Sequence, residues 1–228
     1  MNAALLKRLA SLSRENYRQF TLTLIPNLPS HRLLGVPLPE LRRVAKEFSS
    51  HLESEAFLGS LPHAYHEEDL LHAFVLAKET ELTRLSQRLH QFLPHIRNWA
   101  LCDSLRPKLF ARHLPEALPL LRGFLRSPHP YTVRFGMEML MLHYLERDFS
   151  CEHFHWIAEI KSTNYYVKMM QAWYFATALA KQFDFALHFL EKHSPDPWVQ
   201  SKTLQKAKES LRLTAEQKKL LEQRILRG

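Results

Sequence analysis

Helical runs recur along the chain at nearly constant intervals, and this repetition limits the possible fold more than any other feature of the sequence. Runs with apolar residues at helical spacing begin, at intervals of 31 to 34 residues, near His66, Trp99, Pro130, Asn164 and Pro197. Each is followed by a second expected helix, at residues 82–92, 115–125, 151–160, 185–192 and 215–226. Paired helices at such a period are typical of α-solenoids, in which each pair buries its apolar face against its neighbours. The pattern therefore predicts an all-α superhelix.

Glycine and proline usage agrees with this prediction. The 228 residues include only 5 glycines but 13 prolines, and no Asn-Gly or Asp-Gly hairpin signal occurs. Because the intervals vary and the repeats align loosely, we expect a HEAT-like solenoid and not a regular tetratricopeptide array. We predict one domain over residues 1–228, with capping helices in 1–62 and about five helix pairs in 63–228.

The N-terminal segment has its own signals. We expect helices over residues 3–12 and 16–24, with Ser13 capping the second. Pro39 is well placed in the first turn of the next helix, and Gly35 just before it is expected to take a left-handed or closely packed backbone position.

The charge balance indicates a polyanionic partner. The formal net charge is +8 and the sequence pI is about 9.6, which favours nucleic acid or an anionic membrane surface. Two cysteines without a disulfide pattern, and no signal peptide, predict a cytoplasmic protein. No apolar run is long enough to span a membrane.

Nucleotide-dependent, serine-hydrolase and metal chemistry find no support in the motifs. No Walker loop, dinucleotide fingerprint or G-x-S-x-G elbow occurs. The cluster Cys151, His153 and His155 would diverge on a helix and lacks a second ligand group at zinc-like spacing. We therefore expect no cofactor and no metal, and a protein that acts as a monomer.

The first helix of each pair carries the unusual side chains, so we assign these helices to the concave face. Trp99 and Asp103 lie at i and i+4, so in a helix they emerge on one face. Tyr165 and Tyr166 either stack on nucleotides or pack between repeats. Outside the apolar positions of these helices, the sequence places His72, Lys78, Arg134, Lys168, Trp173, Lys202 and Lys206.

Four of these residues, in their order and repeats, resemble the signature of the DNA alkylation repair family, the AlkD-type HEAT-like DNA glycosylases. They are Trp99, Asp103, Arg134 and Trp173. The segment from Leu34-Gly35-Val36 to Arg42 is also similar to the opening of that family. The resemblance covers most of the chain, up to the helix with Lys202 and Lys206.

The resemblance implies a glycosylase that removes N3- or N7-alkylated purines from double-stranded DNA without flipping the base. It implies that Asp103 stabilises an electron-deficient sugar and positions a water. Trp99 and Trp173 would offer π faces to a cation or a polarised sugar. Phosphates would be held by Arg134, Lys168, Lys202 and Lys206.

Two departures from the family pattern leave alternatives open. Ala100 stands where active members tend to carry an acid, and Ala176 stands where a basic residue is usual. A second hypothesis is therefore a non-catalytic relative that recognises distorted or branched DNA. A third is a protein-binding scaffold, which predicts no salt-dependent affinity for DNA.

Overall fold

The computed structural model describes residues 3–146, 148–193 and 195–225, and every regular element in those ranges is a helix. The predicted all-α class of stacked helices is thus confirmed. Contacts within the chain define two compact units, Met1–His113 and Leu114–Gly228, which we call unit 1 and unit 2 and describe separately.

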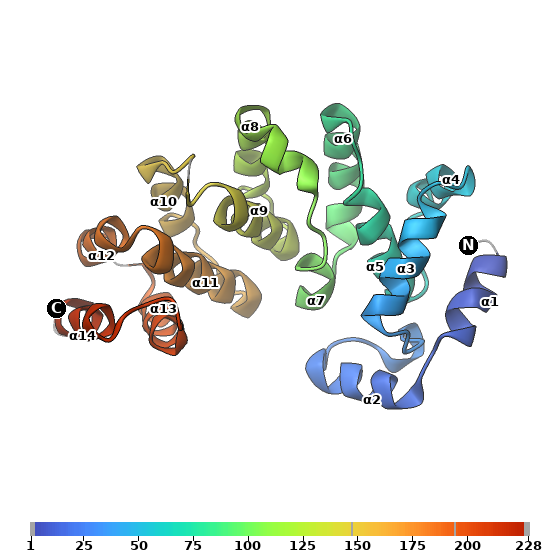
Figure 1. Cartoon of the computed structure of the whole chain (residues 1–228), viewed down its shortest axis with the longest axis horizontal. Helices are drawn as coiled ribbons and strands as arrows, with labels where there is room; N and C mark the ends of the chain where they lie inside the picture. Colours follow the sequence, from blue (N-terminus) through green and yellow to red (C-terminus); the bar gives the residue numbers. More distant parts are fainter. Residues whose placement is uncertain (1–2, 147, 194, 226–228) are drawn as a thin grey trace. The chain divides into compact units, whose positions relative to one another are not determined.

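Unit 1 is built around α5, which packs against α3, α4 and α7 (Figure 1). Buried apolar side chains from α3 and α5 fill the space between them, including Leu41, Val44 and Leu71. The elements of unit 1 are α1 (Ala3–Ser11), α2 (Glu15–Leu24), η1 (Ser30–Arg32), α3 (Leu38–Phe48), α4 (Glu53–Gly59), α5 (His66–Leu76), α6 (Leu82–Phe92), η2 (Leu93–His95), α7 (Trp99–Cys102) and η3 (Lys108–Arg112).

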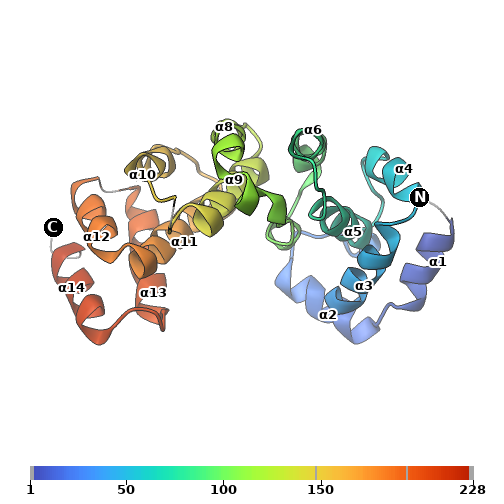
Figure 2. The same ribbon diagram turned by 45° about the horizontal axis from the view of Figure 1, so that its top comes forward.

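Unit 2 consists of two series of helices. In the first series α9 packs on α11 and α11 on α13; in the second, α8, α12 and α14 each pack against a helix of the first (Figures 1 and 2). First helices of successive pairs therefore stack on one another, as the repeat predicts. The elements of unit 2 are α8 (Leu114–Phe124), α9 (Pro130–His143), α10 (Cys151–Ala158), α11 (Tyr165–Lys181), α12 (Phe183–Lys192), α13 (Pro197–Glu209) and α14 (Ala215–Ile225).

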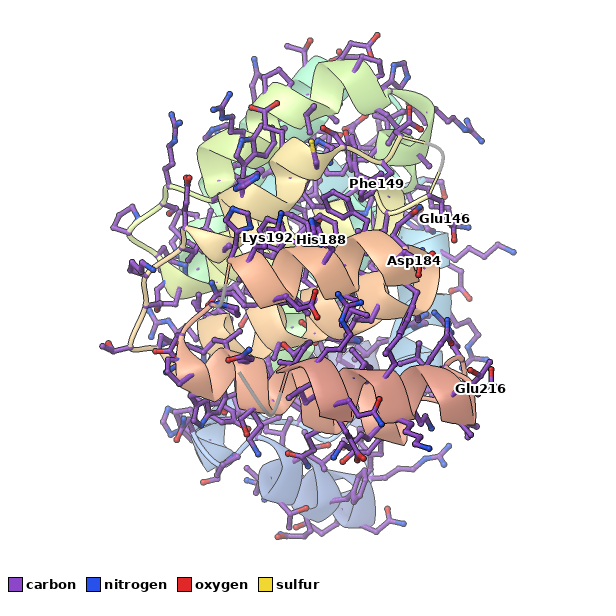
Figure 3. All side chains as sticks on the ribbon, turned by 90° about the vertical axis from the view of Figure 1, so that its left-hand side faces the viewer. Glu146, Phe149, Asp184, His188, Lys192 and Glu216 are labelled. Atoms are coloured by element: carbon purple, nitrogen blue, oxygen red, sulfur yellow. The ribbon has the colours of Figure 1, made fainter. Side chains whose placement is uncertain are left out.

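The outer side of α12 is polar. Asp184, His188 and Lys192 follow one another at i, i+4 and i+8 and are exposed, while Leu187 and Leu190 are buried beneath them (Figure 3). A polar outer stripe over buried leucines is typical of a helix that packs on its neighbours with one face only. Within the described residues, no helix is long and apolar enough to cross a membrane.

The predicted start of each repeat is confirmed to within one residue, but the expected cap at Ser13 and the polar placement of His72 were wrong. The Ser13 hydroxyl donates to the carbonyl of Ala10 at 2.7 Å, and α2 begins after Arg14 without a side-chain cap. The run at Trp99 forms only a single helical turn, because Pro107 follows closely and cannot continue a helix. His72 is not on a polar face: it is buried, with its ring stacked 3.9 Å from that of Phe92.

Gly35 has the left-handed backbone that the sequence predicts, with φ +92°. Its N–H donates to the Glu67 carboxylate at 2.7 Å, and the N–H groups of Leu34 and Val36 bind the same carboxylate at 3.0 and 3.2 Å. A Cβ on Gly35 would lie 2.7 Å from the Cβ of Arg18. Only glycine at this position therefore lets the segment before α3 pack against α2 and bind Glu67 of α5 at the same time.

We expect Gly35→Ala to lower the free energy of unfolding by about 1–3 kcal/mol, because it adds backbone strain and a clash with α2. Chemical denaturation of both proteins measures the difference. Gly59→Ala is the matched control, since a Cβ there meets no atom within 4 Å. An equal effect of the two substitutions would show that the left-handed position is not the cause.

Candidate functional site

The single turn of α7 places Trp99 and Asp103 four residues apart at its two ends. Asn98 caps the turn by accepting the N–H of Leu101 at 2.9 Å, and the N–H of Asp103 closes it on the Trp99 carbonyl at 2.9 Å. Leu101 and Cys102 are buried and anchor the turn. Trp99 and Asp103 are both half-buried. The expected i, i+4 pairing of an indole and a carboxylate is thus present in the structure.

An apolar pocket of about 210 Å³ lies beside this turn. Its wall on the α2 side is formed by Tyr17, Phe20 and Leu24, and Trp99 and Asp103 lie on the α7 side. His66, at the start of α5, also lines the pocket and is only 3% exposed. We call this cavity the apolar pocket. Its aromatic and aliphatic lining places apolar side chains on one side of Asp103.

A second, basic cavity of about 800 Å³ also reaches Asp103. We call it the basic cleft. Its floor includes Phe74, over which the Arg42 guanidinium lies 5.0 Å from the ring centroid. The cations that line it are Arg42, Lys78, Arg106, Lys108 and Arg112. Asp103 and Ser104 line both cavities. Asp103 therefore lies where a cluster of cations meets an apolar wall.

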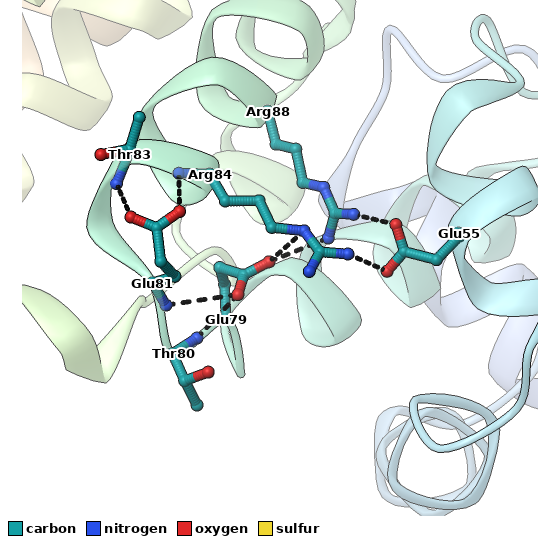
Figure 4. A network of polar contacts seen from close by, with 7 residues as sticks. All are labelled: Glu55, Glu79, Thr80, Glu81, Thr83, Arg84 and Arg88. Carbon is teal, nitrogen blue, oxygen red and sulfur yellow. Dashed lines mark hydrogen bonds and ion pairs between the residues drawn. The ribbon is translucent and has the colours of Figure 1, made fainter.

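Glu79, the other carboxylate of the basic cleft, is held by two arginines from α6. Its Oε2 lies 3.0 Å from Nη1 of Arg88 and 3.4 Å from Nε of Arg84 (Figure 4). Both arginines also contact Glu55 of α4, and the hydrogen bond from Arg84 holds the pKa of Glu55 below its usual range. Since Glu79 is engaged in this network, it does little to reduce the attraction of the cleft for an anion.

Burial makes unit 1 sensitive to acid. Desolvation lowers the pKa of His63 and of His66 to about 4 and that of His72 to about 2, so all three are neutral in the folded protein near pH 7. Burial also raises the pKa of Asp69, which faces Arg32, to about 7. Unfolding below pH 6.5 lets the histidines take up protons, while Asp69 releases one.

The net uptake of about two protons predicts that stability falls by roughly 3 kcal/mol per unit as the pH drops from about 6 to 5. Denaturant titrations at a series of pH values test this slope. His188→Gln, on the exposed side of α12, should leave it unchanged. A stability that is the same at pH 5 and pH 7 would contradict the account.

In unit 2, Arg134 is not on the surface. It is 4% exposed, and its Nη1 donates to the backbone carbonyl of Tyr166 at 2.9 Å, which ties α9 to α11. Trp173 is half-buried on α11. A contact of Arg134 with phosphate remains a prediction, but the structure gives this side chain a clear packing role.

The predicted lysines of unit 2 are partly exposed. Lys168 lies 5.0 Å from the Trp198 ring centroid and 2.9 Å from Oδ1 of Asp196. That hydrogen bond holds the pKa of Asp196 below its usual value. Lys202 and Lys206 are both half-buried on one face of α13, as expected, and Lys202 lies 6.0 Å from the Trp198 ring.

Comparison with known protein families matches residues 5–211 to the family described as DNA alkylation repair enzyme. The chain belongs to this family. No curated protein and no solved structure gives a significant match. The match to the DNA alkylation repair enzyme family covers α1 to α13, so it includes all of the candidate residues in both units.

The two positions at which the chain departs from the family pattern have a structural context. Ala100 packs against the apolar cluster of Ile25, Leu28 and Leu33 and lines the apolar pocket, where a charged carboxylate would be costly. Ala176 is 6% exposed and faces the interior of unit 2. The chain thus keeps an apolar surface where an additional acid would lie.

The sequence interpretation missed three cations of the basic cleft: Arg106, Lys108 and Arg112. They follow Asp103 closely in the chain, in a segment between two expected helices. The η3 turn and the preceding proline instead bring them to the same cavity as Arg42 of α3. A basic residue spacing of R-x-K-x-x-x-R next to the candidate carboxylate was the available signal.

Proposed function

We propose that the protein is a DNA glycosylase that hydrolyses the N-glycosidic bond of N3- or N7-alkylated purines in duplex DNA. The observation that carries this proposal is the position of Asp103 at the boundary between the basic cleft and the apolar pocket, with Trp99 one turn before it. Membership of the DNA alkylation repair enzyme family agrees with it.

The chemistry needs few groups because alkylation at N3 or N7 makes the purine cationic. The base then departs with the electron pair of its C1′–N bond and becomes neutral, so no general acid is required. The sugar becomes an oxocarbenium-like cation, which the Asp103 carboxylate stabilises. A water adds its oxygen to C1′ and passes its proton to the carboxylate or to solvent.

Each surface next to Asp103 supports one part of this reaction. The cations of the basic cleft suit the phosphates that flank the lesion. The apolar pocket lowers the local dielectric constant and so strengthens the attraction between the carboxylate and a developing cation. The Trp99 ring offers a π face to that cation, worth about 0.5–2 kcal/mol.

The proposal includes contacts of unit 2 with the DNA. Trp173 would offer a π face to it, and Lys168, Lys202 and Lys206 would contact phosphates. The lesion would stay in the base stack and be recognised through its backbone. Uracil or other neutral bases should not be released, because they lack the positive charge that makes alkylpurines good leaving groups.

The experiment is to incubate the protein with duplexes that contain 7-methylguanine, 3-methyladenine or uracil and to measure the released bases. We expect release of the two alkylpurines only. Release of uracil at a similar rate would contradict a mechanism that relies on a cationic leaving group.

The second candidate is a non-catalytic protein that recognises distorted or branched DNA. The apolar surroundings of Ala100 favour it, because position 100 supplies no carboxylate. It predicts tighter binding to a four-way junction than to linear duplex, with no base release from either. Equal affinity for the two DNAs would argue against it.

A further inference from the structure

Four aromatic rings, from the stacked helices α9, α11 and α13 of unit 2, form a row in which each ring contacts the next. Tyr131 of α9 lies 5.8 Å from Tyr166 of α11, and Tyr166 lies 5.2 Å from Tyr165. Tyr165 in turn lies 5.6 Å from Trp198 of α13, all measured between ring centroids. We call these four residues the aromatic row. Excision as proposed above uses none of them.

The row lies at the surface. Tyr165 is 55% exposed, and Tyr131, Tyr166 and Trp198 are half-buried. Each ring stands in the first turn of its helix, and Tyr131, Tyr166 and Trp198 are each followed by a buried residue. The backbone beside three of the four rings is thus anchored by a buried side chain. The row itself presents aromatic surface to solvent. Apolar side chains that adjoin one another at the surface indicate an interaction site more often than scattered ones do.

Cations accompany the aromatic row. Lys168 and Lys202 lie 5.0 and 6.0 Å from the centroid of Trp198. Beside them is a hollow of about 560 Å³, whose lining includes Lys161, Lys168 and Asp196. Ser162 and Thr163 add hydroxyl groups to it. Lys168 thus both lines a polar hollow and contacts the end of the aromatic row at Trp198.

We propose that the aromatic row binds unpaired nucleotides of single-stranded DNA, with bases stacked on the rings and phosphates in the neighbouring hollow. Exposed rings next to lysines are the arrangement with which proteins hold single strands, because every base has a π face and every linkage has a charge. A closed duplex keeps its bases stacked on one another and could offer only its backbone to this surface.

This inference does not rest on the excision chemistry, only on DNA as the partner. An unpaired strand occurs wherever DNA is branched or locally opened. The aromatic row would then give the protein a second mode of DNA contact, separate from Trp99 and Asp103 of unit 1. Binding to the row and base release can be measured independently, so one can fail without the other.

The test compares two labelled oligomers of about ten units that carry the same phosphates, oligothymidylate and an oligomer of abasic sugars. Fluorescence anisotropy measures the affinity for each. We expect the wild-type protein to bind oligothymidylate at least about tenfold more tightly. Tyr165→Ala should weaken that binding about 5- to 100-fold and leave the abasic oligomer unaffected, whereas Tyr165→Phe should retain it.

Trp156→Ala is the matched control. Trp156 is an aromatic residue of α10 that contacts Arg122, 4.6 Å from its ring, and it belongs to the same unit but not to the row. Its substitution should change neither affinity. Equal binding of the two oligomers by the wild-type protein, or an equal loss for both in Tyr165→Ala, would overturn the inference. Loss of oligothymidylate binding in Trp156→Ala would also overturn it.

Discussion

Replacing Asp103 with Asn should reduce the release of 7-methylguanine from duplex DNA by about 10²- to 10³-fold, the usual effect of removing a group that stabilises transition-state charge. The substitution keeps the size of the side chain but removes its charge. The backbone of the α7 turn should remain, since its N–H groups bind Asn98 and the Trp99 carbonyl. Affinity for duplex DNA should therefore be unchanged or slightly higher.

A matched variant separates this effect from a general change of charge. Asp184→Asn makes the same substitution on the exposed side of α12 (Figure 3) and should release the base at the wild-type rate. Single-turnover rates with excess protein compare the three proteins directly. If Asp103→Asn released 7-methylguanine as fast as the wild type, Asp103 would have no part in the reaction.

The double substitution Lys108→Ala and Arg112→Ala should weaken duplex binding by about 10- to 100-fold at low salt. Both cations line the basic cleft next to Asp103, and the expected loss corresponds to about 0.7–1.4 kcal/mol for each cation. If each contacts one phosphate, the slope of log affinity against log salt should fall in magnitude by about two. Sequence preference should not change.

The control removes a cation from elsewhere in the chain. Lys192→Ala, on the exposed side of α12, lowers the net charge without touching the basic cleft and should leave the salt slope unchanged. The loss of duplex affinity can be compared per charge removed. If this loss is the same for Lys192→Ala and for the double variant, the overall charge of the protein attracts the DNA. A contact at the cleft would then be excluded.

Most helix positions could be predicted because apolar periodicity and proline punctuation are local signals. Pro130 and Pro197 stand at the first helical position, and the sequence also placed Gly35 correctly in a left-handed conformation. The burial of His72 and Arg134 could not be predicted in the same way. Their environments come from other helices: Phe92 of α6 stacks on His72, and the Tyr166 carbonyl of α11 accepts from Arg134.

The candidate site was only partly predictable for the same reason. Trp99 and Asp103 are four residues apart, so one helical turn suffices to pair them. The two cavities that meet at Asp103 depend on α2, α3 and α5, which are distant in sequence. The apolar character of position 100 likewise reflects a contact with Ile25 and Leu33 that sequence spacing does not reveal.

Whether the cavity boundary at Asp103 hydrolyses the N-glycosidic bond can be measured in a single-turnover time course. One 7-methylguanine is placed in a defined duplex, and released base and abasic sites are both counted. We expect the wild-type protein to form them in equal amounts and at the same rate. Complete binding of the duplex without release of base would contradict the proposed hydrolysis and leave a DNA-binding protein without glycosylase activity.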